Sequence, residues 1–188
     1  NMILINACTH GVALDASDGR KIWAGEPGSG NYSTPVVFEI NKEPCAAIYG
    51  KQSLNVVTVD KGKVVWSTPW DTSYNVNAAD PIISGKDIFI SSGYGKGCAL
   101  FRFNGKNGTE IWRNRNMRNH FSSCVLIDGY LYGIDGNAGK GGLKCISWKT
   151  GEQKWEEKLG FGALCAADGK LVVLTERGKL HIAAADPT

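Results

Sequence analysis

Short apolar runs separated by polar turn residues follow one another along the whole chain. Runs such as residues 54–59 and 171–175 are rich in β-branched side chains and are flanked by turn formers. Such runs are typical of β-strands that end in tight turns. No segment has the sustained 3.6-residue apolar period of an amphipathic helix. The pattern therefore predicts an all-β protein with almost no helix.

The expected strands fall into five successive units of a single domain. The first and last units have three strands each, and the three units between them have four. The units cover approximately residues 1–25, 33–68, 78–113, 121–157 and 162–188. The expected strands are residues 2–8, 11–16 and 20–24; 35–40, 45–49, 54–59 and 63–67; 81–84, 87–91, 98–103 and 110–113; 123–127, 130–134, 143–148 and 153–156; and 162–166, 171–175 and 180–184.

A glycine followed four residues later by a tryptophan closes each of the first four units. The four copies are Gly19 with Trp23, Gly62 with Trp66, Gly108 with Trp112, and Gly151 with Trp155. Their tryptophans are 43, 46 and 43 residues apart, a period typical of the four-stranded blades of a β-propeller. We expect the glycine to allow the tight turn into the fourth strand. The tryptophan has a large flat surface that can be buried between two blades.

The units add up to a partial arc of about four to five blades, whereas closed propellers typically have four to eight. An open arc leaves two blade faces without a neighbour, which costs stability. We therefore expect a part of a larger propeller whose remaining blades lie outside this chain. Closure into a small ring and pairing of two chains are the alternatives. The first residue, Asn1, falls within an expected strand, which also indicates a fragment or a trimmed domain.

The segment from Ala13 to Trp23, Ala-Leu-Asp-Ala-Ser-Asp-Gly-Arg-Lys-Ile-Trp, resembles the tryptophan-docking repeat of PQQ-like (quinoprotein) β-propellers. The later copies keep the glycine and tryptophan but lose the Ala and Asp positions. The resemblance extends over the whole chain, to the family of quinoprotein alcohol dehydrogenase-like and outer-membrane assembly propeller-like repeats. It implies that each indole packs against the motif of the adjacent blade as a structural staple. It also implies a periplasmic or extracellular location.

Composition and charge exclude several classes of function. The net charge is only +3, from 21 basic and 18 acidic residues scattered along the chain, which argues against a nucleic-acid-binding surface. The nearest basic cluster, Arg113, Arg115 and Arg118, is interpreted as a solvated loop. No apolar run is long enough for a transmembrane segment. The six cysteines occur singly, without the spacing of a zinc, haem or redox site; we interpret them as small buried hydrophobes, and disulfides remain open.

The resemblance raises the alternative that the chain is part of a PQQ-dependent dehydrogenase that oxidises alcohols or sugars. Such enzymes use a carboxylate base, a Ca²⁺ held by Glu, Asn and Asp, and often a pair of adjacent cysteines. The chain has no Cys-Cys pair, and Glu26, Asp71 and Asp135 are isolated acids in expected loops. We therefore name no catalytic or metal-binding residue and expect no cofactor; PQQ with Ca²⁺ remains the alternative.

The connections between blades, residues 28–33, 70–80, 113–122 and 158–161, are expected on one rim of the ring, where they line its central funnel. The candidate ligand-facing residues on them are Tyr32, Trp70, Tyr74, Asn75, Asn77, Asn119 and His120. Aromatic rings with amides suit a polar small molecule, a glycan or a protein segment. Alternatively, these side chains only satisfy the backbone of their loops. Residues 93–97 and 139–142 are interpreted as simple glycine-rich turns. The sequence thus predicts a non-catalytic ligand-binding or protein-interaction propeller.

Overall fold

The computed structural model describes residues 1–188 and consists of five antiparallel sheets without a helix. It therefore has no helix that could cross a membrane. Each sheet is built from consecutive strands, and we number the sheets as blades 1 to 5. The strands are β1 (Met2–Ile5), β2 (Val12–Asp15) and β3 (Lys21–Ala24) in blade 1; β4 (Val36–Ile40), β5 (Glu43–Tyr49), β6 (Ser53–Thr58) and β7 (Val64–Pro69) in blade 2; β8 (Ile82–Ser84), β9 (Asp87–Ser92), β10 (Gly97–Phe103) and β11 (Gly108–Asn114) in blade 3; β12 (Val125–Ile127), β13 (Tyr130–Asn137), β14 (Lys140–Ser147) and β15 (Gln153–Glu157) in blade 4; and β16 (Gly162–Ala167), β17 (Lys170–Thr175) and β18 (Leu180–Ala184) in blade 5.

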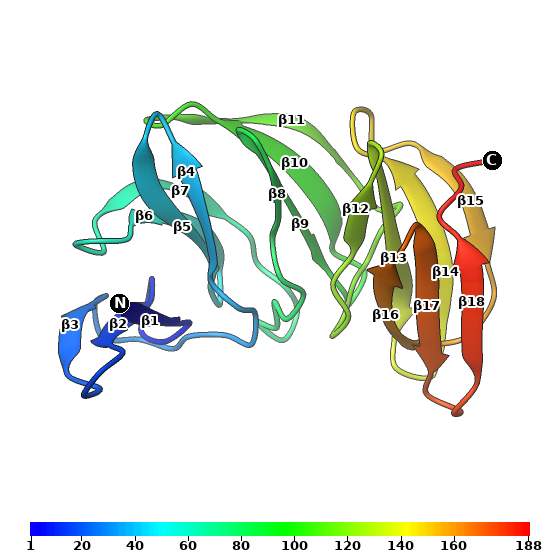
Figure 1. Cartoon of the computed structure of the whole chain (residues 1–188), viewed down its shortest axis with the longest axis horizontal. Coiled ribbons are helices and arrows are strands. Elements are labelled where there is room, and N and C mark those ends of the chain that lie inside the picture. Colours follow the sequence, from blue (N-terminus) through cyan, green and yellow to red (C-terminus); the bar gives the residue numbers. More distant parts are fainter.

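The blades succeed one another in an open arc, with β1–β3 at one end and β16–β18 at the other (Figure 1). This is a partial β-propeller, as the sequence predicts. Most expected strands agree with the observed ones to within two residues. The chain forms a simple up-and-down meander in every blade, so neighbouring strands in the sequence are also neighbours in the sheet.

The hydrophobic core is a series of clusters that each lie between two blades. The largest has 12 buried residues from blades 2 and 3 and the connection between them, including Trp70. Strand β10 shows how the sequence produces this arrangement. Its residues Cys98 and Leu100 pack toward blade 4, whereas Ala99, Phe101 and Phe103 pack toward blade 2. Because alternate side chains of a strand point to opposite faces, a strand buried on both faces has an almost continuous apolar run.

The tryptophans of the first three copies of the motif each lie against the glycine of the next copy. A Cβ added to Gly62 would be 2.3 Å from the Trp23 ring, and one added to Gly151 would be 2.6 Å from the Trp112 ring. The indole Nε1 of Trp23 donates a hydrogen bond to the carbonyl of Val59 (2.9 Å), just before the next glycine. Trp112 donates the equivalent bond to the carbonyl of Trp148 (2.9 Å), whereas Trp66 joins its two blades by packing against Gly108.

The glycine of the third copy has a different role from the one expected. Gly19, Gly62 and Gly151 have positive φ angles of 74°, 66° and 70° and do form left-handed turns. Gly108 has no positive φ and is the first residue of β11. A Cβ at this position would lie 2.0 Å from Cε2 of Trp66. Glycine is required there by the close approach of the indole, whereas the turn does not need it.

The hairpin of blade 4 also differs from the prediction. Residues 139–142 were expected to form a flexible turn, but Lys140 to Gly142 belong to β14 and pair with β13. Asp135, expected in a loop, lies within β13 opposite Gly142. The glycines lack the side-chain pattern that would mark a strand, so the pairing was not visible in the sequence. The hairpin consequently extends the blade beyond its apolar run.

All six cysteines are unpaired. Cys45, Cys98, Cys124 and Cys145 are buried, Cys8 is half-buried and Cys165 is exposed. Burial raises the pKa of the Cys98 thiol to about 12. Cys98 is therefore protonated and unreactive at neutral pH, because the thiolate is the nucleophile.

Candidate functional site

One rim of the arc carries the connections between blades. In an antiparallel meander, the connection to the next blade leaves from the same end as the hairpin between the second and third strands of a four-stranded blade. We call this end the loop face; it contains residues 25–35, 70–81, 115–124 and 158–161, with the β1–β2, β5–β6, β9–β10, β13–β14 and β17–β18 hairpins. All the candidate ligand-facing residues predicted from the sequence lie on these segments.

Three large aromatic side chains are exposed on the loop face. The exposed fractions of Tyr32, Tyr74 and Phe121 are 71%, 70% and 57%. The rings of Tyr32 and Phe121 meet edge to face, with centroids 6.1 Å apart, and Tyr74 contacts Tyr94 at 4.8 Å. Three different connections supply the three exposed rings, so the fold gathers residues that are far apart in the sequence.

A cavity of about 530 Å³ opens beside Tyr32 and Tyr74. It is bounded by the β1–β2 turn, by residues 28–32 and by residues 74–76, and Lys51 contributes a positive charge. Its volume is in the range of small-molecule sites. Two exposed rings and several amides therefore surround one space.

The amide side chains around this cavity hold its walls in place. Asn31 Nδ2 donates to the carbonyl of Asn75 (2.9 Å), and the backbone N–H of Asn31 donates to Asn6 Oδ1 (3.2 Å). Asn75 has a positive φ of 54°, a conformation that Asn adopts more readily than most residues. Asn75 thus lines the cavity, and its carbonyl is part of the wall.

His120 lies at the centre of the aromatic group. It is 7% exposed, and its Nε2 is 2.9 Å from the hydroxyl of Tyr94. Its ring centroid is 4.0 Å from that of Phe121. Nδ1 is buried without a hydrogen-bond partner. Desolvation lowers the pKa of His120 below its usual value, so the imidazole is neutral at pH 7.

Trp70 and Asn77 do not face the solvent, in contrast to the expectation. Trp70 is 1% exposed and Asn77 is fully buried. Trp70 Nε1 donates to Ser92 Oγ (3.1 Å), whose hydroxyl donates to Asn77 Oδ1 (2.7 Å). Asn77 Nδ2 donates to the carbonyl of Gly50 (2.9 Å). Both side chains are used inside the protein, where they fix the connection between blades 2 and 3.

Asn119 is also buried, with 1% exposure. Its Nδ2 donates to the carbonyl of Ile134 (3.0 Å), and its Oδ1 accepts from Cys124 Sγ (3.0 Å). Its backbone N–H donates to Ser91 Oγ (2.9 Å). The side-chain nitrogen and oxygen of Asn119 are thus both bonded within the protein, and neither is directed at a ligand. The alternative interpretation, that an amide only supports its loop, describes this residue.

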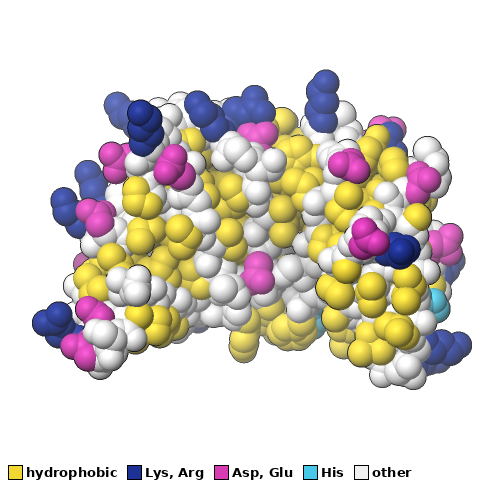
Figure 2. Space-filling view, in the orientation of Figure 1, with side chains coloured by type: hydrophobic (Ala, Val, Ile, Leu, Met, Phe, Trp, Pro, Cys, Tyr) yellow, Lys and Arg dark blue, Asp and Glu magenta, His cyan; other side chains and the backbone are white.

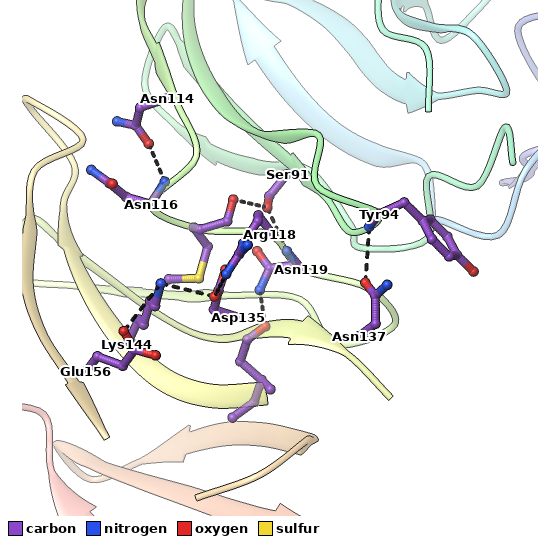
Figure 3. A network of polar contacts seen from close by, with 12 residues as sticks. Ser91, Tyr94, Asn114, Asn116, Arg118, Asn119, Asp135, Asn137, Lys144 and Glu156 are labelled. Atoms are coloured by element: carbon purple, nitrogen blue, oxygen red, sulfur yellow. Dashed lines mark hydrogen bonds and ion pairs between the residues drawn. The ribbon is translucent and has the colours of Figure 1, made fainter. Parts of the chain in front are cut away.

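A network of charges lies on the same rim at blade 4 (Figure 3). The two carboxylate oxygens of Asp135 accept from Nε and Nη2 of Arg118, at 3.0 and 2.6 Å. Lys144 Nζ is 3.0 Å from Asp135 and 3.6 Å from Glu156. Asp135 was regarded as isolated in the sequence, whereas it is a paired strand residue.

Of the three arginines expected in one solvated loop, Arg115 is exposed just after β11, whereas the other two form ion pairs. Arg113 belongs to β11, pairs with Glu110 at 2.6 Å and lies over the ring of Trp70 at 4.6 Å. Arg118 is held by Asp135. Asp135 is 17 residues from Arg118 and lies on β13, so the local sequence could not show this pair. Glu110 lies three residues before Arg113 on the same strand.

Four residues of the aromatic site, by which we mean the cavity and the rings around it, were not identified from the sequence: Asn31, Lys51, Tyr94 and Phe121. Tyr94 belongs to residues 93–97, which do form the turn between β9 and β10 as interpreted, but the turn also places a ring beside His120. Phe121 follows His120 directly, and a large apolar residue in a polar connection is a signal that could have identified it.

The acidic side chains of this chain give no support for a Ca²⁺–PQQ centre. No three or more His, Cys, Asp or Glu side chains lie close enough together to hold a metal ion. Asp135, a buried carboxylate on the rim, is already paired with Arg118 and Lys144. A Ca²⁺ site requires six to eight oxygen ligands, several of them carboxylates. Within this chain, no cluster of three or more acidic side chains marks the position of such a site.

The comparisons with known proteins agree with the architecture. A family model described as "Outer membrane protein assembly factor BamB" matches residues 2–157. The chain is 30% identical over 169 residues to the quinoprotein alcohol dehydrogenase PedH of Pseudomonas putida, which is 80% of this chain but only 27% of PedH. The solved structure of BamB from Moraxella catarrhalis matches with a TM-score of 0.53 and 16% identity over 98% of this chain and 72% of that one. The quinohemoprotein alcohol dehydrogenase from Comamonas testosteroni matches with a TM-score of 0.63 and 12% identity over 97% of this chain and 41% of that one.

Proposed function

We propose that this chain is a non-catalytic binding module of the family to which it belongs, the PQQ-like β-propeller repeat family of the outer membrane protein assembly factor BamB. Its loop face takes a polar ligand with flat faces, a glycan or a peptide segment. The observation that carries the proposal is the exposure of Tyr32 and Tyr74 beside a cavity of about 530 Å³.

Physical chemistry favours binding over a purely structural role for these two rings. An aromatic ring that is about 70% exposed contributes little to the core. Such rings supply a large, rigid contact area to a partner at low entropic cost. The amides and Lys51 at the same cavity add hydrogen-bond and charge contacts that can orient a ligand.

The proposal is tested by screening the chain against a glycan array and a random peptide library. The strongest binder is then titrated against the wild type and against Tyr32→Ala/Tyr74→Ala. Each lost stacking contact contributes about 0.5–1.5 kcal/mol, so the double variant should bind about tenfold or more weakly. Val37→Ala, at an apolar position on β4 that is 57% exposed, is the control. Absence of any binder, or equal binding by the double variant, would overturn the proposal.

A second candidate is a segment of a quinoprotein dehydrogenase, favoured by the 30% identity to PedH. No cluster of three or more His, Cys, Asp or Glu side chains in this chain supports it. Titration with PQQ and Ca²⁺ followed by absorbance should show no saturable change. Saturable binding with alcohol-dependent dye reduction would establish this second candidate instead.

We also propose that the chain works in the periplasm or outside the cell, because its family description refers to outer-membrane assembly. An alkaline phosphatase fusion to the chain in its natural gene should be active. An inactive fusion would contradict this location.

A further inference from the structure

Two adjoining cavities at the β13–β14 hairpin of blade 4 are lined by polar residues and glycines, unlike the cavity beside Tyr32 and Tyr74. Each has a volume of about 300 Å³, and they share Arg118, Gly136 and Lys140. No hydrophobic residue lines either of them. They have no lining residue in common with the cavity at Tyr32 and Tyr74. The loop face therefore carries a second and separate concave surface that is polar throughout.

Positive charge exceeds negative charge around these cavities. The acids present are Asp135 and Glu156, and both face Lys144 at 3.0 and 3.6 Å. Asp135 is shared further with Arg118. Lys140 and Lys158 line the second cavity and form no ion pair. Three lining cations, Arg118, Lys140 and Lys158, thus face two lining carboxylates. The buried Lys144, which pairs with both carboxylates, raises the local surplus to two positive charges.

Arg118 is a fixed donor at the junction of the two cavities. Its Nε and Nη2 are bonded to the two oxygens of Asp135, which is 4% exposed (Figure 3). Nη1 makes no hydrogen bond within the protein, and the side chain is 40% exposed. A guanidinium held by a buried carboxylate loses little freedom when its remaining N–H groups bind an anion. Lys144 on the other side of Asp135 is only 7% exposed, so the support beneath Arg118 is also fixed.

The opening of the site is not blocked by side chains. A Cβ added at Gly95 would meet nothing within 4 Å. Gly136, Gly141 and Gly142 form most of the remaining wall. Lys140 and Lys158 are exposed and have long flexible chains, so they can close over a ligand from two sides.

We propose that these joined cavities bind an oxyanion, the phosphate or carboxylate groups of a ligand, through Nη1 of Arg118 and the ammonium groups of Lys140 and Lys158. The site is independent of the proposed aromatic site, because the two have no residue in common. Two joined cavities with a surplus of two charges favour a ligand with more than one anionic group. Charge-assisted hydrogen bonds of this kind are about twice as strong as neutral ones.

The test uses the whole chain and two probes, inorganic pyrophosphate and citrate, titrated by calorimetry at constant ionic strength. The charge-removing variant is Lys140→Gln/Lys158→Gln. The matched control is Lys86→Gln/Lys106→Gln, two exposed lysines in the β8–β9 and β10–β11 turns at the opposite rim. All four side chains are exposed and none of them forms an ion pair, so all variants should keep the wild-type circular dichroism and melting temperature.

The wild type should bind at least one probe with one-site saturation. Each lost cation should weaken binding about tenfold, so the Lys140/Lys158 variant should bind about a hundredfold more weakly and the control should bind as the wild type does. Binding of pyrophosphate alone would identify a phosphate ligand, and binding of citrate alone a carboxylate ligand. Failure to saturate with either probe, or an equal loss in the control variant, would overturn the proposal.

Discussion

The contact between Gly108 and Trp66 gives the sharpest test of how the repeated motif holds the blades together. Replacing Gly108 by Ala places a Cβ 2.0 Å from Cε2 and 2.2 Å from Cζ2 of Trp66. Ordinary contacts begin at about 3.4 Å, so the indole or strand β11 must move by roughly 1 Å or more. Overpacking of this kind costs about 1–3 kcal/mol. Gly108 has no positive φ, so backbone strain adds nothing to this cost.

A double-mutant cycle separates this clash from every other effect of the substitution. Trp66→Ala alone should cost about 3–5 kcal/mol. In that background the ring is gone, and Gly108→Ala should be neutral or stabilise the strand by up to about 1 kcal/mol. The coupling between the two positions is therefore about 1–3 kcal/mol or more.

Urea unfolding followed by circular dichroism measures the cycle without relying on tryptophan fluorescence. The control is Gly19→Ala, the same motif position in blade 1. Gly19 has a φ of 74° and no atom within 4 Å of an added Cβ, so it should cost about 1–2 kcal/mol from backbone strain and should not couple to Trp66. A coupling within about 0.5 kcal/mol of zero between residues 108 and 66 would refute the packing argument.

Three further predictions concern other parts of the fold. Trp112→Ala should lower the free energy of unfolding in urea by about 3–5 kcal/mol, because the indole packs on Gly151 and donates to the carbonyl of Trp148 at 2.9 Å. A near-neutral result would place the indole outside the blade interface. Because burial lowers the pKa of His120, the unfolded chain binds more protons at acid pH and stability should fall as the pH drops below about 6.5. His120→Gln should flatten that dependence in unfolding curves, and an unchanged slope would show that another group titrates. Asp135→Asn should cost about 3–5 kcal/mol by thermal or urea unfolding, because it leaves the buried Lys144 and Arg118 without their shared carboxylate; a loss within 1 kcal/mol would show that the network is solvated.

The fold could be predicted from the sequence because the relevant signals are local. Apolar runs and turn residues mark the strands, and the fixed offset from Gly to Trp marks the position of each blade. The need for a glycine at position 108 could not be predicted, because it comes from the close approach of the Trp66 ring on another blade. Likewise, Lys140 to Gly142 carry no strand pattern and are recognised only by their pairing with β13.

From the sequence, the candidate site could be assigned to one rim of the arc, but its individual residues could not be identified reliably. Aromatic and amide residues in the connections pointed to the correct face, but the sequence did not separate Trp70 from Tyr74. Both are aromatic residues of one connection, yet Trp70 is 1% exposed and Tyr74 is 70% exposed. The difference depends on Ser92 and on the core of blades 2 and 3, which are distant in sequence.

Hydrophobic side chains also gather over β16–β18 at the C-terminal end of the arc (Figure 2). Leu174, Leu180 and Ile182 are 54%, 61% and 64% exposed there. This surface could compete with the loop face for an apolar ligand in any binding experiment. A measurement that locates the bound ligand is therefore more decisive than an affinity alone.

The most direct test of the account is to map a bound ligand by amide chemical-shift changes in the ¹⁵N-labelled chain. The strongest binder from the glycan or peptide screen is titrated into the protein. The account predicts that the largest changes fall on residues 28–32 and 74–76, with little change on β16–β18. Changes confined to β16–β18, or spread evenly over the chain, would contradict a binding site at the loop face.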